Sequence, residues 1–132
     1  MEVKRRTDYA IRMMTRLATD LGSPMSVRTM SDADDVPYQF ARAIQRDLAD
    51  AGLIKVIRGA RGGAILAKPT NEITLLDIVK STQGKPECSP CTRDADWCSR
   101  MGACSVHDIW RELDSMTMKY LESVKLADIT EK

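Results

Sequence analysis

All four cysteines and the single histidine of this 132-residue chain lie in one stretch of twenty residues, CSPCTRDADWCSRMGACSVH, at positions 88–107. Thiolates and imidazole are ligands for zinc and for iron–sulfur clusters. The stretch has no clear hydrophobic period and is interrupted by proline and glycine, which is typical of a functional or disordered loop. The pattern therefore predicts a metal centre, and both zinc and an iron–sulfur cluster fit it. The candidate ligands are Cys88, Cys91, Cys98, Cys104 and His107.

The same cysteines also raise the question of thiol chemistry. Thioredoxin-like activity places a Cys-x-x-Cys pair after a strand at a helix N-terminus, whereas Cys88 and Cys91 lie in a proline-flanked loop. No Ser/His/Asp set and no phosphate-binding glycine loop stands out. The sequence therefore predicts a protein that is not an enzyme, and a zinc-stabilised or disulfide-switched regulator is the stronger rival to a cluster.

Composition places the chain among ordinary globular proteins, with 30% charged and 43% hydrophobic residues. The start, MEVKRRTDYAIRMM, lacks the apolar core of a signal peptide, and no stretch approaches the roughly 18 apolar residues that span a bilayer. We expect a cytoplasmic protein with no membrane partner. Thiols stay reduced in that compartment, so the cysteines favour metal binding over a disulfide framework.

Charge is distributed unevenly along the chain. Residues 1–70 contain 12 Lys and Arg against 8 Asp and Glu, a net charge of +4, and residues 71–132 contain 8 against 11, a net charge of −3. The front half can therefore face a polyanion such as nucleic acid, although solvated mixed charge gives a similar count.

Helical spacing of apolar residues predicts three helices in the front half. Thr7 or Asp8 is expected to cap the first helix and Gly22 to end it, Ser26 to cap the second, and Pro37 to open the third, which Gly52 ends. The inward positions are predicted to be Ala10, Ile11, Met14, Leu17, Ala18 and Leu21 in the first helix, Val27, Met30 and Ala33 in the second, and Phe40, Ala41, Ile44, Leu48 and Ala51 in the third.

After Gly52 the period changes to two short β-leaning runs, LIKVIR and GAILAK, joined by GARGG. Three helices followed by a basic hairpin predict a winged helix-turn-helix, with the third helix in the major groove and the wing on phosphates or the minor groove. The polar face of the third helix also includes Gln45. The predicted contacts with double-stranded operator DNA are Arg28, Tyr38, Gln39, Arg42, Arg46, Arg58 and Arg61.

The back half is expected to supply a dimer contact. The run TLLDIVKST predicts a short helix with Thr74 and Asp77 in capping-box positions. Further on, apolar residues recur at alternating three and four residues, as in a seam between a helix and its symmetry mate, although docking on the same chain gives the same stripe. The seam consists of Val106, Ile109, Leu113, Met116 and Tyr120, continued less well by Val124 and Ala127.

The stretch PYQFARAIQRDLADAGLIKVIRGARGGAILAKP resembles the recognition helix and wing of the IscR/NsrR, or Rrf-two, family of bacterial transcription regulators. Its most specific part is A-G-L-I-x-x-x-R-G-x-x-G-G at positions 51–63. The opening TDYAIR at 7–12, the segment HDIWREL at 107–113 and the segment LADI at 126–129 are similar too, so the resemblance covers nearly the whole chain. It implies a DNA-binding homodimer.

The resemblance also implies an iron–sulfur cluster. Cluster-binding members carry Cys-x5-Cys-x5-Cys, which implies Cys91, Cys98 and Cys104 as ligands; six residues fill the first gap here, and this leaves Cys88 able to replace Cys91. A histidine placed like His107 implies the preferred 2Fe-2S cluster. An aspartate placed like Asp8, donated by the partner subunit, would imply a 4Fe-4S cluster.

These observations predict a mainly α fold with a small β-wing, in which a winged helix-turn-helix domain is followed by a long C-terminal dimerisation helix. The expected division is residues 1–83 for DNA binding, 84–104 for the cysteine-rich cluster loop, and 105–132 for the dimerisation helix and tail. Cluster status, iron supply, redox state or nitric oxide would then control DNA affinity.

Overall fold

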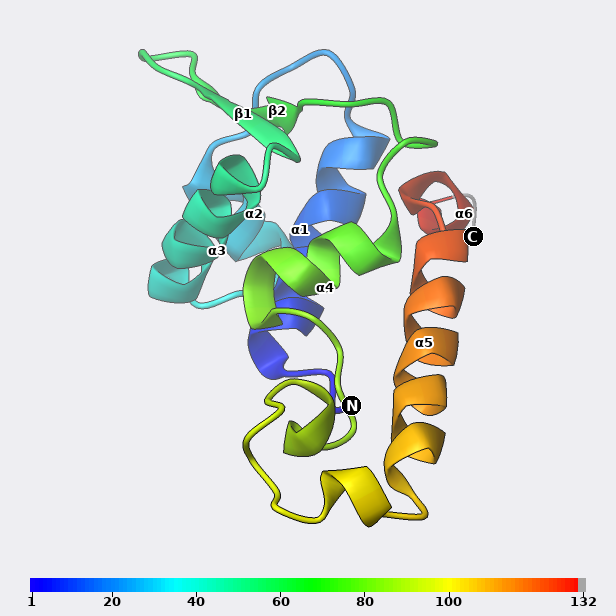
Figure 1. Cartoon of the computed structure of the whole chain (residues 1–132). Helices are drawn as coiled ribbons and strands as arrows, with labels where there is room; N and C mark the ends of the chain where they lie inside the picture. Colours follow the sequence, from blue (N-terminus) through cyan, green and yellow to red (C-terminus); the bar gives the residue numbers. More distant parts are fainter. Residues whose placement is uncertain (131–132) are drawn as a thin grey trace.

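The computed structural model of the protein describes residues 1–130 (Figure 1). It is mainly helical, with one two-stranded antiparallel sheet, and this confirms the expected fold class. In chain order the elements are α1 (Arg5–Thr19), α2 (Val27–Asp34), α3 (Tyr38–Asp50), β1 (Ile54–Ile57), β2 (Gly63–Leu66), α4 (Leu75–Gln83), the 3-10 turns η1 (Pro90–Thr92) and η2 (Met101–Ala103), α5 (His107–Ser123) and α6 (Leu126–Thr130).

Local sequence explains most helix starts. The Ser26 hydroxyl accepts the Thr29 amide at 3.1 Å and caps α2, as predicted. Thr74 and Asp77 form the expected capping box at the start of α4, each side chain accepting the other's backbone N–H at 3.0 and 2.9 Å. Pro37 is the residue immediately before α3 rather than its first residue.

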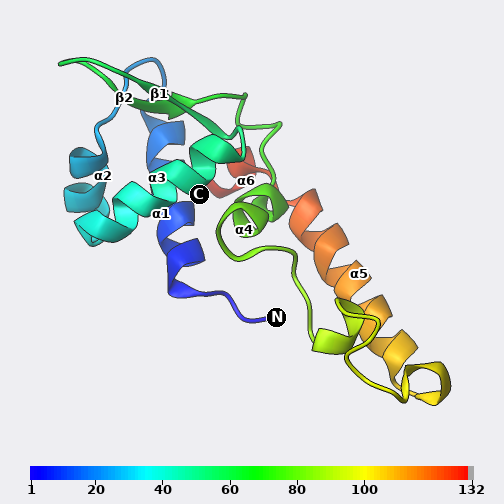
Figure 2. The same ribbon diagram turned by 60° about the vertical axis from the view of Figure 1, so that its left-hand side comes forward.

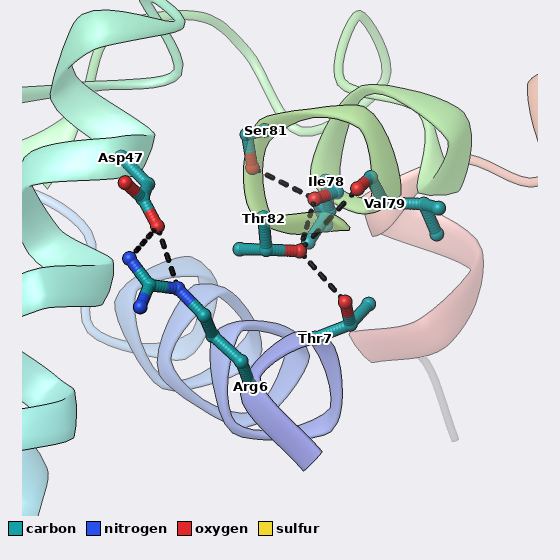
Figure 3. Close-up of polar contacts among 7 residues, drawn as sticks. All are labelled: Arg6, Thr7, Asp47, Ile78, Val79, Ser81 and Thr82. Atoms are coloured by element: carbon teal, nitrogen blue, oxygen red, sulfur yellow. Dashed lines mark hydrogen bonds and ion pairs between the residues drawn. The ribbon is translucent and has the colours of Figure 1, made fainter. Parts of the chain in front are cut away.

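The predicted cap of α1 was wrong. The helix begins at Arg5, with Lys4 at the cap position and no side-chain cap. Thr7 is instead fully buried, and its hydroxyl lies 2.8 Å from that of Thr82 in α4 (Figure 3). Asp8 accepts a hydrogen bond from Arg12 at 2.9 Å, one helical turn later.

A single core joins the first four helices, the sheet and α6. Four residues expected inside are exposed: Ala33 faces solvent on α2, Leu21 lies beyond the end of α1, Ala51 lies beyond the end of α3, and Phe40 is 45% exposed while its ring packs edge-on against Tyr9. The buried apolar cluster comprises Tyr9, Ala10, Met13, Met14, Leu17, Met25, Met30, Val36, Ala41, Ile44, Leu48, Leu53, Ile54, Ala64, Ile73, Ile78 and Leu126.

The wing is seated on the segment that precedes α2. In the β1–β2 pair Ile54 faces Leu66, and an isolated bridge joins Met25 to Ala64 through two backbone hydrogen bonds of 3.0 and 2.8 Å. A Cβ on Gly63 would lie 2.5 Å from the Met25 carbonyl group, and the φ of Gly63 is +155°. Only glycine permits this close approach of two backbones.

The C-terminal helix is shorter than its apolar seam predicted. α5 ends at Ser123, Val124 is extended, and the chain turns back into α6, so Val124 and Ala127 do not continue a seam on one helix. The Leu75 and Leu126 amides donate to the carbonyls of Val124 and Ile73 at 2.8 Å each, and the Leu126 side chain is fully buried. The far end of α5 is thereby tied to the winged domain.

The wing and the cysteine-rich loop lie at opposite ends of the molecule (Figures 1 and 2). The first four helices gather beneath the wing, and α5 projects away from them and meets the loop at its N-terminal end. Within residues 1–130, no helix has the length and apolar character needed to cross a membrane. The last two residues of the predicted 105–132 segment lie outside the described part of the chain.

Candidate functional site

One candidate surface is the exposed face of α3. Gln39, Arg42 and Arg46 all extend from it into solvent. Tyr38 is half-buried, and the guanidinium of Arg28 from α2 stacks over its ring, with 4.1 Å between the guanidinium carbon and the ring centroid. This stacking presents a cation beside the N-terminus of α3, where it can reach a phosphate.

The wing extends the basic surface. Arg58 and Arg61 are exposed on the turn between β1 and β2, and the hairpin projects past the helices in both views (Figures 1 and 2). The turn is tight: a Cβ on Gly62 would lie 2.0 Å from the Ile57 carbonyl oxygen, and Gly59 has a φ of +115°. These glycines let the turn close with both arginines outward.

A hollow of about 270 Å³ separates α3 from β1. Arg42 and Arg46 border it, and Val56 of β1 lines its other side. Gln45 also lines it, and its Oε1 is the one buried side-chain oxygen or nitrogen within residues 1–130 that lacks a hydrogen-bond partner. An amide can both donate and accept, so Gln45, which the helical pattern placed on the polar face of this helix, belongs with this surface.

The second candidate site is the cysteine-rich loop, whose first half rests on α5. The Cys91 sulfur lies 3.4 Å from His107 Nδ1, at the first residue of α5. The Cys88 thiol donates to the Trp110 carbonyl at 3.5 Å. The structure therefore brings together two of the predicted ligands, Cys91 and His107.

The second half of the loop forms backbone hydrogen bonds within its own turns. Cys98 and Cys104 are half-buried free thiols that flank η2, and their backbones take part in 3.4 Å hydrogen bonds with Met101. Within residues 1–130 no three His, Cys, Asp or Glu side chains converge closely enough to hold a metal ion. Of the predicted set, Cys98, Cys104, Asp8 and Cys88 thus stay apart from a common centre.

Asp114 was not singled out in the sequence, yet it organises the start of the loop. Its carboxylate accepts the Cys88 amide at 2.8 Å. Burial by itself would raise the pKa of Asp114, but the adjacent Thr92 hydroxyl and Cys88 outweigh burial and lower that pKa. Burial, reinforced by the nearby Asp114, raises the pKa of the Cys88 thiol. Asp114 is the buried residue on the inner face of α5 and it is polar, so a search for apolar periodicity does not select it.

The chemical types of the candidate ligands suit an iron–sulfur cluster. Thiolate sulfurs with one imidazole are soft ligands, and all four cysteines are unpaired. Cys91 and His107 also fit in placement, since both face the same point at the start of α5.

A basic helix and wing on a winged helix-turn-helix scaffold define the class of a DNA-binding regulator. The comparison with known sequences is specific: the Rrf2 family model, described as an iron-dependent transcriptional regulator, matches residues 3–132. The chain belongs to the Rrf2 family, and it is a transcription regulator rather than an enzyme.

Individual relatives agree with this assignment. A putative HTH-type transcriptional regulator of Mycobacterium tuberculosis is 31% identical over 133 residues, covering 98% of this chain and 81% of that protein. The HTH-type transcriptional regulator NsrR of Shouchella clausii is 28% identical over 131 residues, covering 98% of this chain and 88% of that protein.

Solved structures share the fold. The IscR of T. potens has a TM-score of 0.78 at 23% identity, covering 99% of this chain and 87% of its own. CymR, the global cysteine regulator of B. subtilis, has the same TM-score at 22% identity and covers 99% and 97%.

Proposed function

We propose that this regulator is a homodimer whose affinity for operator DNA is controlled by an iron–sulfur cluster held in the cysteine-rich loop. The observation that carries the proposal is the 3.4 Å contact between the Cys91 sulfur and His107 Nδ1, which pairs a thiol and an imidazole at the start of α5. Kinship with regulators named NsrR supports it.

The proposed ligands are Cys91, Cys98, Cys104 and His107, for which a 2Fe-2S cluster is preferred. The other candidates are Cys88 in place of Cys91, and Asp8 of a partner subunit in place of His107 with a 4Fe-4S cluster. When bound, a cluster supplies reversible redox chemistry and a fixed point for the loop. The contribution of the chain is to hold Cys91 beside His107 and to keep Cys98 and Cys104 on a loop that can close toward them.

The dimer contact is proposed to be the outer face of α5. Its apolar side chains all face solvent in the single chain, including Ile109 at 55% exposure and Tyr120 at 68%. An apolar stripe of this length along one helix is typical of an interface between protein subunits. The stripe comprises Val106, Ile109, Trp110, Leu113, Met116 and Tyr120.

In the proposed complex α3 enters the major groove of the operator. Gln39, Arg42 and Arg46 reach bases or phosphates, Arg28 and Tyr38 act from the N-terminal end of α3, and Arg58 and Arg61 of the wing reach phosphates or the minor groove. Two subunits related by a two-fold axis would read two half-sites, so the distance between their α3 helices sets operator affinity.

The chain offers a contact route from the loop to α3. Gln83 is the last residue of α4 and directly precedes the loop, and its side chain accepts the Lys4 amide at 3.0 Å. Arg6, on the first turn of α1, donates from its Nε to Asp47 of α3 at 2.8 Å, and the neighbouring Thr7 contacts Thr82 of α4 (Figure 3). Ordering of the loop can thus bear on α3 through α1.

Protein purified without oxygen tests the proposal through its absorption spectrum and its iron, sulfide and zinc content. Iron and sulfide in near-equal amounts, lost in Cys98→Ala and Cys104→Ala, would support it. Two irons per chain would favour His107, and four would favour Asp8. Protein that takes up neither iron nor sulfide on anaerobic reconstitution would refute it.

A zinc site or thiol switch on the same scaffold is the second candidate. The first two thiols are separated by only two residues, and both rest on the first turn of α5 through His107 and the Trp110 carbonyl. Zinc alone, or a Cys88–Cys91 disulfide whose formation changes operator affinity, would favour this candidate.

A further inference from the structure

The inner face of α5 buries a charged side chain. The helix has 17 residues, and its one buried residue is the charged Asp114, at 8% exposure, while its apolar stripe faces solvent. A buried carboxylate is costly unless it accepts hydrogen bonds, so its position calls for a specific partner.

That partner is the backbone at the start of the cysteine-rich loop. Asp114 Oδ1 accepts the Cys88 amide at 2.8 Å. The neighbouring Glu87 pairs with Arg93 at 2.9 Å, and Thr92 donates to the Ser89 carbonyl at 2.8 Å. Segment 87–93 is therefore folded on itself and is fastened to α5 through Asp114.

Asp114 lies on the same helix as His107, the proposed ligand that contacts Cys91. Asp114 follows His107 by seven residues, about two turns of helix, so the two side chains lie on the same side of α5, about 10 Å apart along its axis. Asp114 holds the backbone of Cys88, and His107 meets the thiol of Cys91 three residues later. Two points of the loop are thus set against two points of one helix.

We infer that Asp114 is a positioning residue of the cysteine-rich site, which fastens the Cys88 backbone to α5 and thereby sets Cys91 opposite His107. The inference rests on the proposed function, because it assigns how the ligand loop of that same site is held. It also gives Cys88 the role of a backbone anchor whose thiol points to the Trp110 carbonyl rather than to a shared centre.

The test compares Asp114→Ala and Asp114→Asn with the control Asp108→Ala, an exposed carboxylate on the same helix whose side chain is 90% exposed. In metal-free protein, Asp114→Ala should speed amide hydrogen exchange of segment 87–93 by roughly tenfold or more, because the Cys88 amide loses its acceptor. Asp114→Asn keeps an acceptor oxygen and should preserve most of the protection, and Asp108→Ala should change nothing.

Anaerobic reconstitution with ferrous iron and sulfide supplies the second readout. Asp114→Ala should bind less iron per chain than wild type, with Asp114→Asn restoring it. Unchanged exchange in Asp114→Ala, or loss in Asp114→Asn equal to that in Asp114→Ala, would each overturn the inference.

The two proposals fail separately. If wild-type protein takes up no iron, the proposed function fails, and the exchange data alone decide whether Asp114 fastens the loop. If wild type takes up iron and Asp114→Ala takes up as much, the positioning role fails and the proposed function stands. Should Asp114→Ala not fold, Asp114→Leu, which also lacks an acceptor oxygen, replaces it in both measurements, with the same expected and contradicting outcomes.

Discussion

The winged domain, residues 5–83, and the cysteine-rich loop with α5, residues 84–123, are organised by different interactions. The buried apolar cluster is drawn from the first region together with Leu126 of α6. In the second region α5 exposes its apolar stripe and buries one carboxylate. The wing points toward the proposed DNA, whereas the loop lies at the opposite end (Figure 2).

This difference shows how one small chain can combine a fixed shape with a response. The winged domain has enough buried apolar surface to hold α3 and the wing rigidly. The loop contributes no residue to the apolar cluster, and it contains soft ligand groups and is hydrogen-bonded to the buried Asp114. We therefore expect its order to depend on what it binds. Under the proposed function, a signal at the loop would change the relation of two subunits while each winged domain keeps its fold.

Introducing charge into the apolar stripe of α5 is expected to have the largest effect. Leu113→Lys combined with Met116→Lys should turn the dimer into a monomer and weaken operator binding by about 100-fold or more, because a single half-site is then bound alone. The winged domain should keep its melting temperature. Sedimentation and operator titration measure both effects.

The matched control is Glu122→Lys, which introduces the same residue on the opposite side of α5 and should leave the dimer intact. A double variant that stays dimeric, or a monomer that binds the operator as tightly as wild type, would contradict the assignment of the stripe.

The next largest effect tests the packing of the wing. Gly63→Ala places a Cβ 2.5 Å from the Met25 carbonyl group, so the wing must shift and stability should fall by about 2–3 kcal/mol. Gly102→Ala, in the loop, meets no atom within 4 Å and should be nearly neutral. Equal melting temperatures for the two variants would argue against this contrast between the regions.

A smaller effect is expected from the wing tip. Arg58→Ala removes a proposed phosphate contact and should cost about 1–2 kcal/mol of operator affinity, with a less steep dependence on salt. Lys80→Ala on α4 removes the same charge far from the proposed interface and serves as the control. Titrations at several salt concentrations would refute the wing contact if the two variants behave alike.

The smallest effect is expected from the capping box within the winged domain. Thr74→Ala removes one half of the capping box at the start of α4 and should lower stability by about 1 kcal/mol. Ser81→Ala, which removes a hydroxyl bonded only within α4, is the comparison. Chemical denaturation that gives the same midpoint for both would show that the box contributes nothing here.

Sequence reasoning was most successful where the signal is local. Caps, glycine turns and apolar periods predicted α2, α3, α4 and the wing, because such signals act within a few residues. It placed Thr7 or Asp8 at a helix cap because a cap is the commonest local role for these residues; burial of Thr7 against Thr82 arises from tertiary packing that local sequence does not encode.

The candidate cluster site was predictable in composition but not in arrangement. The clustered cysteines and histidine were all candidates, and the family resemblance implied Cys91 and His107, which do meet, yet neither signal could say how far Cys98 and Cys104 stand from them. The sequence did not indicate a role for Asp114, and the reason is physical. Periodicity detects apolar faces, and α5 has its apolar face outward and its one buried anchor is polar.

The return of the chain through α6 anchors α5 to the winged domain at its C-terminal end. Its C-terminal end is clamped to the winged domain by the hydrogen bonds of Leu75 and Leu126, and its other end carries the loop. A helix of 17 residues is about 25 Å long, so a tilt of about 5° at the clamp moves the free end by about 2 Å. Under the proposed function, a small displacement of the loop would therefore change the angle of α5 beside Thr74 and the base of α4.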